Sequence, residues 1–79
     1  MHWTSYLSDE VRNRLYNCET IKSDLKELVD AKWRAYIESG KNINGYTKED
    51  ALVSVLELLD CNSCYFDLDK EEYDELRRE

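Results

Sequence analysis

The sequence predicts an all-α protein, a compact bundle of three to four short helices in which residues 1–79 form one domain. Proline is absent and glycine occurs only at Gly40 and Gly45, whereas sheet proteins need turn residues about every 8–12 positions. Apolar residues recur instead at steps of three and four, which is the spacing of one helical face. A chain of this length buries only about 60–65% of its unfolded surface, so its core must be small.

The first helix is expected to start at Ser8, whose hydroxyl can cap it and which is followed by two acidic residues. Three apolar positions then share one face: Val11, Leu15 and Cys18. Trp3 and Leu7 extend this stripe backward, so a start near Thr4 is the alternative.

A second helix is expected to start at Ser23 or Asp24 and to end at Ser39, with Gly40 as a left-handed cap. Its inward stripe comprises Ile21, Leu25, Leu28, Val29, Trp33, Tyr36 and Ile37. Residues 17–23 are rich in cap-type side chains and mark the break between the two helices. A single helix over residues 8–39, about 48 Å long, is the alternative and would suit a dimer.

The third helix is expected to follow a loop at residues 41–46, where Asn44-Gly45 is a turn dipeptide. Thr47 and Asp50 form a capping-box-like start. A wide apolar arc then predicts a central helix that ends near Asp60, with Val53 outside the arc. The arc comprises Ala51, Leu52, Val55, Leu56, Leu58 and Leu59.

A last helix is predicted over residues 70–78, capped by Asp67 or Asp69 and with Tyr73 and Leu76 facing inward.

Charge is divided unevenly along the chain. Residues 1–44 hold seven basic and seven acidic side chains, whereas residues 45–79 hold four basic and eleven acidic ones and so carry the whole net charge of −7. This distribution disfavours direct binding of nucleic acid by the second half, because phosphates would be repelled. It favours a protein partner with a basic surface, such as a nucleic-acid-binding protein or a nuclease.

The predicted partner-binding surface combines the acids of the last two helices with nearby tyrosines, because carboxylates can imitate phosphate rows and aromatic rings can stack on arginine. It comprises Glu49, Asp50, Glu57, Asp60, Tyr65, Asp67, Asp69, Glu71, Glu72, Tyr73, Asp74 and Glu75. Acids that only keep a terminal helix solvated are the alternative interpretation.

Cys61-Asn62-Ser63-Cys64 is a Cys-x-x-Cys motif, which with Cys18 and His2 would supply four zinc ligands. A second such pair is missing, and the motif follows a helix end, where the dipole would raise a thiol pKa. The preferred interpretation makes Cys18 and one of the pair small buried apolar residues. We therefore expect no metal and no cofactor.

Catalytic patterns are also missing. The only histidine is His2, and no serine or cysteine stands beside a plausible base. We expect a protein that is not an enzyme.

These patterns predict a non-enzymatic, stoichiometric inhibitor that blocks a basic partner, of phage anti-defence (anti-CRISPR or anti-restriction) or immunity/antitoxin type. At the level of fold alone, the expected architecture is similar to the small acidic helical immunity proteins of nuclease bacteriocins. One alternative is a self-associating adaptor in which the stripe over residues 11–37 joins two copies. Another is a small zinc-binding or redox module built on Cys18, Cys61 and Cys64.

The expected location is the cytoplasm. An odd number of cysteines, three, argues against a secreted disulfide framework, because one cysteine would be left without a partner. The start of the chain, Met1-His2-Trp3-Thr4, does not resemble a signal peptide. No stretch approaches the roughly 18 apolar residues of a membrane span. The sequence is compatible with a monomer and with a homodimer.

Overall fold

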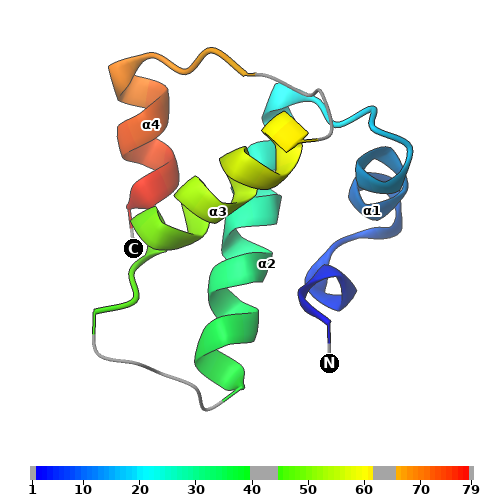
Figure 1. The fold of residues 1–79 in the computed structure, drawn as a ribbon, viewed down its shortest axis with the longest axis horizontal. Coiled ribbons are helices and arrows are strands. Elements are labelled where there is room, and N and C mark those ends of the chain that lie inside the picture. Colours follow the sequence, from blue (N-terminus) through cyan, green and yellow to red (C-terminus); the bar gives the residue numbers. More distant parts are fainter. Residues whose placement is uncertain (1, 40–44, 62–65, 79) are drawn as a thin grey trace.

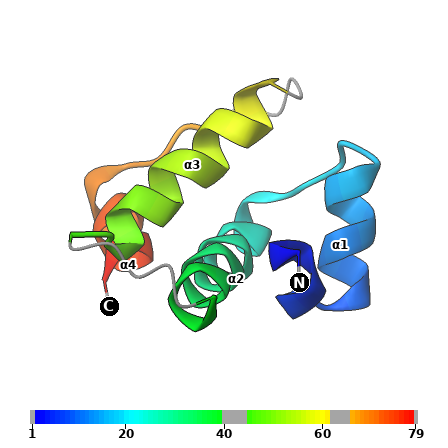
Figure 2. The ribbon, with the colours of Figure 1, turned by 60° about the horizontal axis from the view of Figure 1, so that its bottom comes forward.

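A computed structural model describes residues 2–39, 45–61 and 66–78. These residues form four α-helices and two short 3-10 helices without any strand, which confirms the predicted all-α class (Figures 1 and 2). In chain order the elements are η1 (Trp3–Tyr6), α1 (Asp9–Tyr16), η2 (Lys22–Asp24), α2 (Leu25–Glu38), α3 (Lys48–Cys61) and α4 (Lys70–Arg77).

Helix α2 lies at the centre of the fold, and α3 crosses it (Figure 1). Helix α4 packs against α3 and α2 (Figures 1 and 2). The 3-10 helix η1, which belongs to the N-terminal arm (residues 2–21), also packs against α2. The buried core is almost entirely aliphatic. Its members are Leu7, Val11, Leu15, Leu25, Leu28, Val29, Ala31, Ala51, Leu52, Val55, Leu59 and Leu76.

The first helix is short, so the alternative of one helix over residues 8–39 is wrong. Ser8 caps α1 as predicted, because its hydroxyl accepts a hydrogen bond from the Val11 backbone N–H at 3.4 Å. A start near Thr4 is also wrong, since η1 is a separate turn and Leu7 is extended between it and α1. The chain leaves α1 after Tyr16.

Cys18 explains the end of α1. Its φ of 57° is left-handed, a conformation that a helix cannot continue through. The thiol-bearing residue is therefore exposed beyond the helix end and does not belong to the buried stripe of Val11 and Leu15. The prediction that Cys18 is a small buried apolar residue is wrong for this reason.

Helix α2 starts at Leu25, directly after the start predicted at Ser23 or Asp24, with η2 forming the turn that leads into it. The Asp24 carboxylate holds this turn by accepting a hydrogen bond from the Ile21 backbone N–H at 3.2 Å. Two residues of the predicted inward stripe are instead exposed. Ile21 lies before the helix begins and is 48% exposed, and Ile37 near its end is 37% exposed.

Helix α3 begins with the predicted capping arrangement. The Thr47 hydroxyl accepts from the Asp50 backbone N–H at 3.3 Å, and the Asp50 carboxylate accepts from the Thr47 backbone N–H at 2.9 Å. Val53 is 42% exposed, as its place outside the apolar arc predicted. The Lys48 ammonium lies 2.8 Å from the Asp30 carboxylate and ties the start of α3 to α2. The expected cap at Gly40 and the loop at residues 41–44 lie outside the described residues.

Helix α4 matches its predicted range to within one residue, and its cap is Asp69 and not Asp67. Asp69 accepts from the Glu72 backbone N–H at 2.8 Å, while Glu72 accepts from the Asp69 backbone N–H at 3.2 Å. Leu76 is buried and Tyr73 is half-buried, so both face inward as expected. None of the described helices is long and apolar enough to cross a membrane.

Candidate functional site

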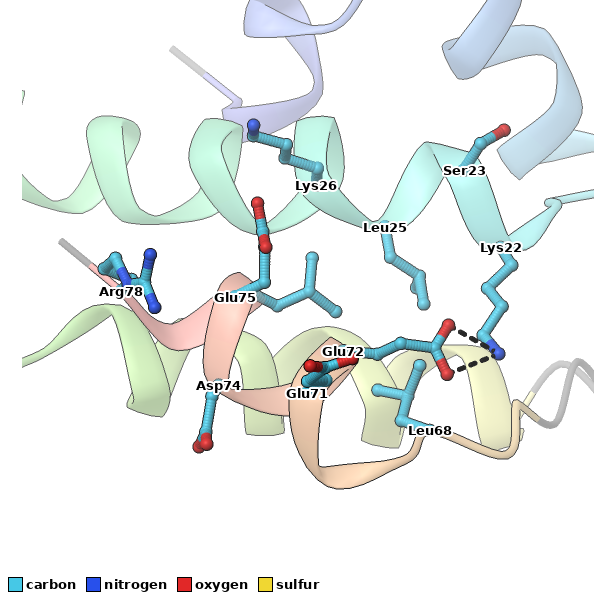
Figure 3. Close-up of a pocket in the computed structure, with 11 residues that line it drawn as sticks. Lys22, Ser23, Leu25, Lys26, Leu68, Glu71, Glu72, Asp74, Glu75 and Arg78 are labelled. Carbon is cyan, nitrogen blue, oxygen red and sulfur yellow. Dashed lines mark hydrogen bonds and ion pairs between the residues drawn. The ribbon is translucent and has the colours of Figure 1, made fainter.

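The acids of α4 border a groove between this helix and the N-terminal part of α2, with a volume of about 630 Å³ (Figure 3). That volume lies within the range of about 300–1,000 Å³ that ligand sites occupy. The groove is lined by Lys22, Ser23, Leu25, Lys26, Leu68, Glu71, Glu72, Asp74, Glu75, Leu76 and Arg78.

Three leucines make the apolar part of the groove. Leu25 belongs to α2, and Leu68 comes from the segment that precedes α4 (Figure 3). Leu76 belongs to α4. Leu25 and Leu76 are members of the buried core, and Leu68 packs against that core while remaining partly exposed. The groove therefore offers an apolar floor that is continuous with the core of the protein.

Most of the charges on the α4 wall are acidic, apart from Arg78 at the end of that helix, and the charges on the facing wall are basic. Helix α4 supplies Glu71, Glu72 and Glu75, and the segment that runs from η2 into α2 supplies Lys22 and Lys26. At one end the walls are joined, because the Lys22 ammonium lies 2.7 and 2.9 Å from the two carboxylate oxygens of Glu72. This hydrogen bond, helped by the one from the Asp69 backbone N–H, lowers the pKa of Glu72 below its ordinary value.

The rest of the groove is open to pairing with a ligand. Among the residues that the structure describes, no hydrogen bond or ion pair engages Lys26, Glu71 or Glu75. All three side chains are exposed. In Figure 3 the Glu75 carboxylate extends from α4 toward α2, on the same side as Lys26. These charges stand on either side of the leucine floor.

A second hollow, of about 490 Å³, lies where the end of α4 meets the start of α3. Arg77 lines this hollow, with its guanidinium 2.8 Å from the Asp74 carboxylate and 3.4 Å from that of Glu49. The same guanidinium lies 5.9 Å from the centre of the Tyr73 ring. One arginine thus compensates two of the predicted site acids and covers one predicted aromatic residue.

The remaining predicted residues are spread over the surface. Asp50 and Asp69 are engaged in helix capping. The other three acids are exposed and line neither hollow: Glu57, Asp60 and Asp67. Tyr65 lies outside the described residues.

The fold therefore gathers Glu71, Glu72, Asp74 and Glu75 around one groove and brings Glu49 to its neighbouring hollow. It also brings cations to them that the sequence argument did not include in the site: Lys22, Lys26, Arg77 and Arg78. The spacing of Lys22 and Lys26 by four indicates that they share one side of a helical segment. No sequence signal says that this side meets α4, because that depends on tertiary packing.

Polar groups also meet at the N-terminal arm. His2 Nδ1 lies 2.8 Å from the Thr4 hydroxyl, which lies 3.0 Å from the Tyr16 hydroxyl. Across the described ranges, no group of three or more histidine, cysteine or acidic side chains is placed to hold a metal ion. Cys61 is exposed at the end of α3, and Cys64 lies outside the described residues.

Comparison with models of known protein families, with curated proteins and with solved structures found no match to this chain.

Proposed function

We propose that this protein is a non-enzymatic binding protein that docks stoichiometrically on a partner with a basic surface and blocks it. The observation that carries the proposal is the pair Glu71 and Glu75. They lie one turn apart on α4, both exposed and unengaged within the described part of the chain, at the border of a groove with a leucine floor. Phage anti-defence inhibition and immunity or antitoxin activity are the settings that we propose.

The spacing of this pair suits arginine recognition. Residues four apart on a helix are separated by about 6 Å along its axis, so two carboxylates can each receive one guanidinium. Arginine also tolerates partial burial beside apolar surface better than lysine does, because its ion is more weakly hydrated. The net charge of −7 would steer such a partner toward the protein and make association sensitive to salt.

The proposal assigns no catalytic step to the groove. The carboxylates that border it are surface groups, and solvated carboxylates are not tuned as a general acid or base in the way that desolvated ones are.

Self-association is less well supported as a function. The apolar stripe that would join two copies includes Leu25, Leu28 and Val29, and all three are already buried within one chain. Light scattering at micromolar concentration tests this alternative directly, because a monomer at that concentration would exclude it.

The proposed function is tested by affinity capture of partners from a lysate at about 50 mM and about 500 mM salt, followed by mass spectrometry. The key variant is Glu71→Lys with Glu75→Lys. Its matched control is Glu57→Lys with Asp60→Lys, which makes the same change in net charge away from the groove. We expect a basic partner that is retained at low salt, lost at high salt, and bound at least tenfold less by the α4 variant than by the control.

Normal capture by the α4 variant would contradict the proposal, because the acidic face of α4 would then not be the binding site. Equal weakening of partner capture in both double variants would show that the net charge of the protein, and not the acidic face of α4, determines binding.

A further inference from the structure

We infer that the α2–α4 groove receives an amphipathic helix of the partner, and that this helix carries basic residues along one border of its apolar stripe and acidic residues along the other. The inference rests on the proposed function and deepens it, because it specifies the element of the partner that is recognised.

The floor of the groove requires an apolar stripe. Leu68 is the partly exposed leucine of this floor, with Leu25 and Leu76 buried beneath it. Polar groups placed on this apolar surface would lose water without gaining hydrogen bonds. A helix that projects leucine, methionine or aromatic side chains at steps of three and four would cover this floor.

The walls specify the borders of that stripe. Glu71 and Glu75 on the α4 wall attract basic side chains, whereas Lys26 on the α2 wall repels them and attracts acidic ones. A uniformly basic helix would therefore gain on one wall and lose on the other. A helix with its charges separated onto two borders gains on both walls, as charges flanking a coiled-coil seam do.

Other occupants fit less well. An extended segment would bring unpaired backbone N–H and C=O groups to walls made of helices, and the described residues include no strand edge to pair with them. Phosphates of a nucleic acid would meet Glu71 and Glu75. A second copy of this chain would carry the same net charge of −7 and would be repelled.

The test uses the full-length protein and three synthetic helical peptides with the same leucine stripe. The first peptide carries arginine along one border and glutamate along the other. The second has the same composition, but arginine and glutamate alternate along both borders, and the third carries arginine along both. Binding is measured by fluorescence anisotropy at about 150 mM salt. Amide chemical shifts in the ¹⁵N-labelled protein locate the contact.

We expect the charge-separated peptide to bind at least tenfold more tightly than either of the others, and to shift amide signals of residues 22–26 and 68–76. The double variant Lys26→Glu with Glu75→Lys keeps the net charge of the protein and makes each wall mixed. It should lose this tenfold preference while its melting temperature and circular dichroism stay unchanged.

Several results would overturn the inference: no binding of any peptide, equal binding of all three, tightest binding of the arginine-only peptide, or shifts located elsewhere. A dimer whose interface shifts map to the groove would also overturn it, because the occupant would then be a second copy. The proposed function is judged separately: partner capture that depends on Glu71 and Glu75 would stand even if the peptides fail.

Discussion

The N-terminal arm, residues 2–21, and the core helices α2 and α3 are held in place by different forces. Leu28, Leu52 and Val55 are completely buried, so α2 and α3 are held together by apolar contact. The arm adds fewer core residues and is fastened by specific polar contacts. Arg14 donates two hydrogen bonds to the carboxylate of Asp24, at 2.7 and 2.8 Å, and the Ser8 backbone N–H donates to Glu27 at 2.7 Å.

Charges serve different purposes in the arm and in α4. In the arm they pair at close range, as Arg14 does with Asp24, which is only 3% exposed. Arg12 pairs with Asp9, and the Tyr6 hydroxyl donates a hydrogen bond to Glu38, which raises the pKa of Tyr6. On α4 the Glu71 and Glu75 carboxylates have no such partner in the described structure. Charge in the arm is therefore engaged in structural pairs, whereas the carboxylates of Glu71 and Glu75 on α4 are not.

The largest expected effect is in the core. Leu52→Ala removes a side chain that is 0% exposed and leaves a cavity between α2 and α3, so we expect a loss of about 3 kcal/mol in the free energy of unfolding. Urea denaturation monitored by circular dichroism measures this loss. The matched control is Val53→Ala on the exposed side of α3, which should change stability by less than about 0.5 kcal/mol. Equal losses in both variants would contradict the assigned core.

The second effect concerns the fastening of the arm. Asp24→Asn keeps the shape of the side chain but removes its charge and one acceptor from Arg14, so we expect a loss of about 2 kcal/mol. In this variant, amide hydrogen exchange should accelerate relative to wild type more in α1 than in α3. Glu19→Gln, at an exposed acid of the arm, serves as the control and should leave exchange unchanged. Uniform acceleration throughout the chain would mean that the arm is not a separate unit.

A smaller effect is expected at the start of α4. Asp69→Ala removes the acceptor for the Glu72 backbone N–H, and loss of such a cap costs about 1 kcal/mol. Asp67→Ala is the matched control, because Asp67 does not cap the helix. Thermal unfolding distinguishes the two variants. A larger loss for Asp67→Ala would contradict the assigned cap.

The smallest expected signal is a dependence on pH of the stability difference between wild type and the Asp24→Asn variant. The hydrogen bond from Arg14 lowers the pKa of Asp24 below its usual 3.8, so its ionised form stabilises the folded state above that pH. This stabilisation is lost as the pH falls through the lowered pKa. Urea denaturation should therefore give a constant difference between wild type and variant from about pH 7 to 5, and a smaller one below 3.8. A constant difference at all pH values would mean that the charge of Asp24 contributes nothing.

Local signals in the sequence were sufficient for most of the helices. Ser8, Thr47 and Asp69 cap as their side chains predict, because capping involves atoms only three residues apart. The end of α1 was harder to predict, since Cys18 adopts a left-handed conformation that non-glycine residues rarely choose. The exposure of Ile21 and Ile37 was missed because periodicity does not show where the neighbouring helices stop.

The acidic surface was predictable only as a list of residues. The sequence correctly placed most of the acids on the last two helices and determined the net charge of −7 and the all-α class, because composition and periodicity are local properties. Tertiary structure alone decided that Lys22 and Lys26 stand across a leucine floor from Glu71 and Glu75, and that Arg77 joins Glu49 to Asp74. The ion pairs that join different segments connect residues far apart in the sequence: Glu49 and Arg77 are 28 residues apart, and Lys22 and Glu72 are 50 residues apart. Such contacts depend on how the helices pack, and no spacing within one helix encodes that.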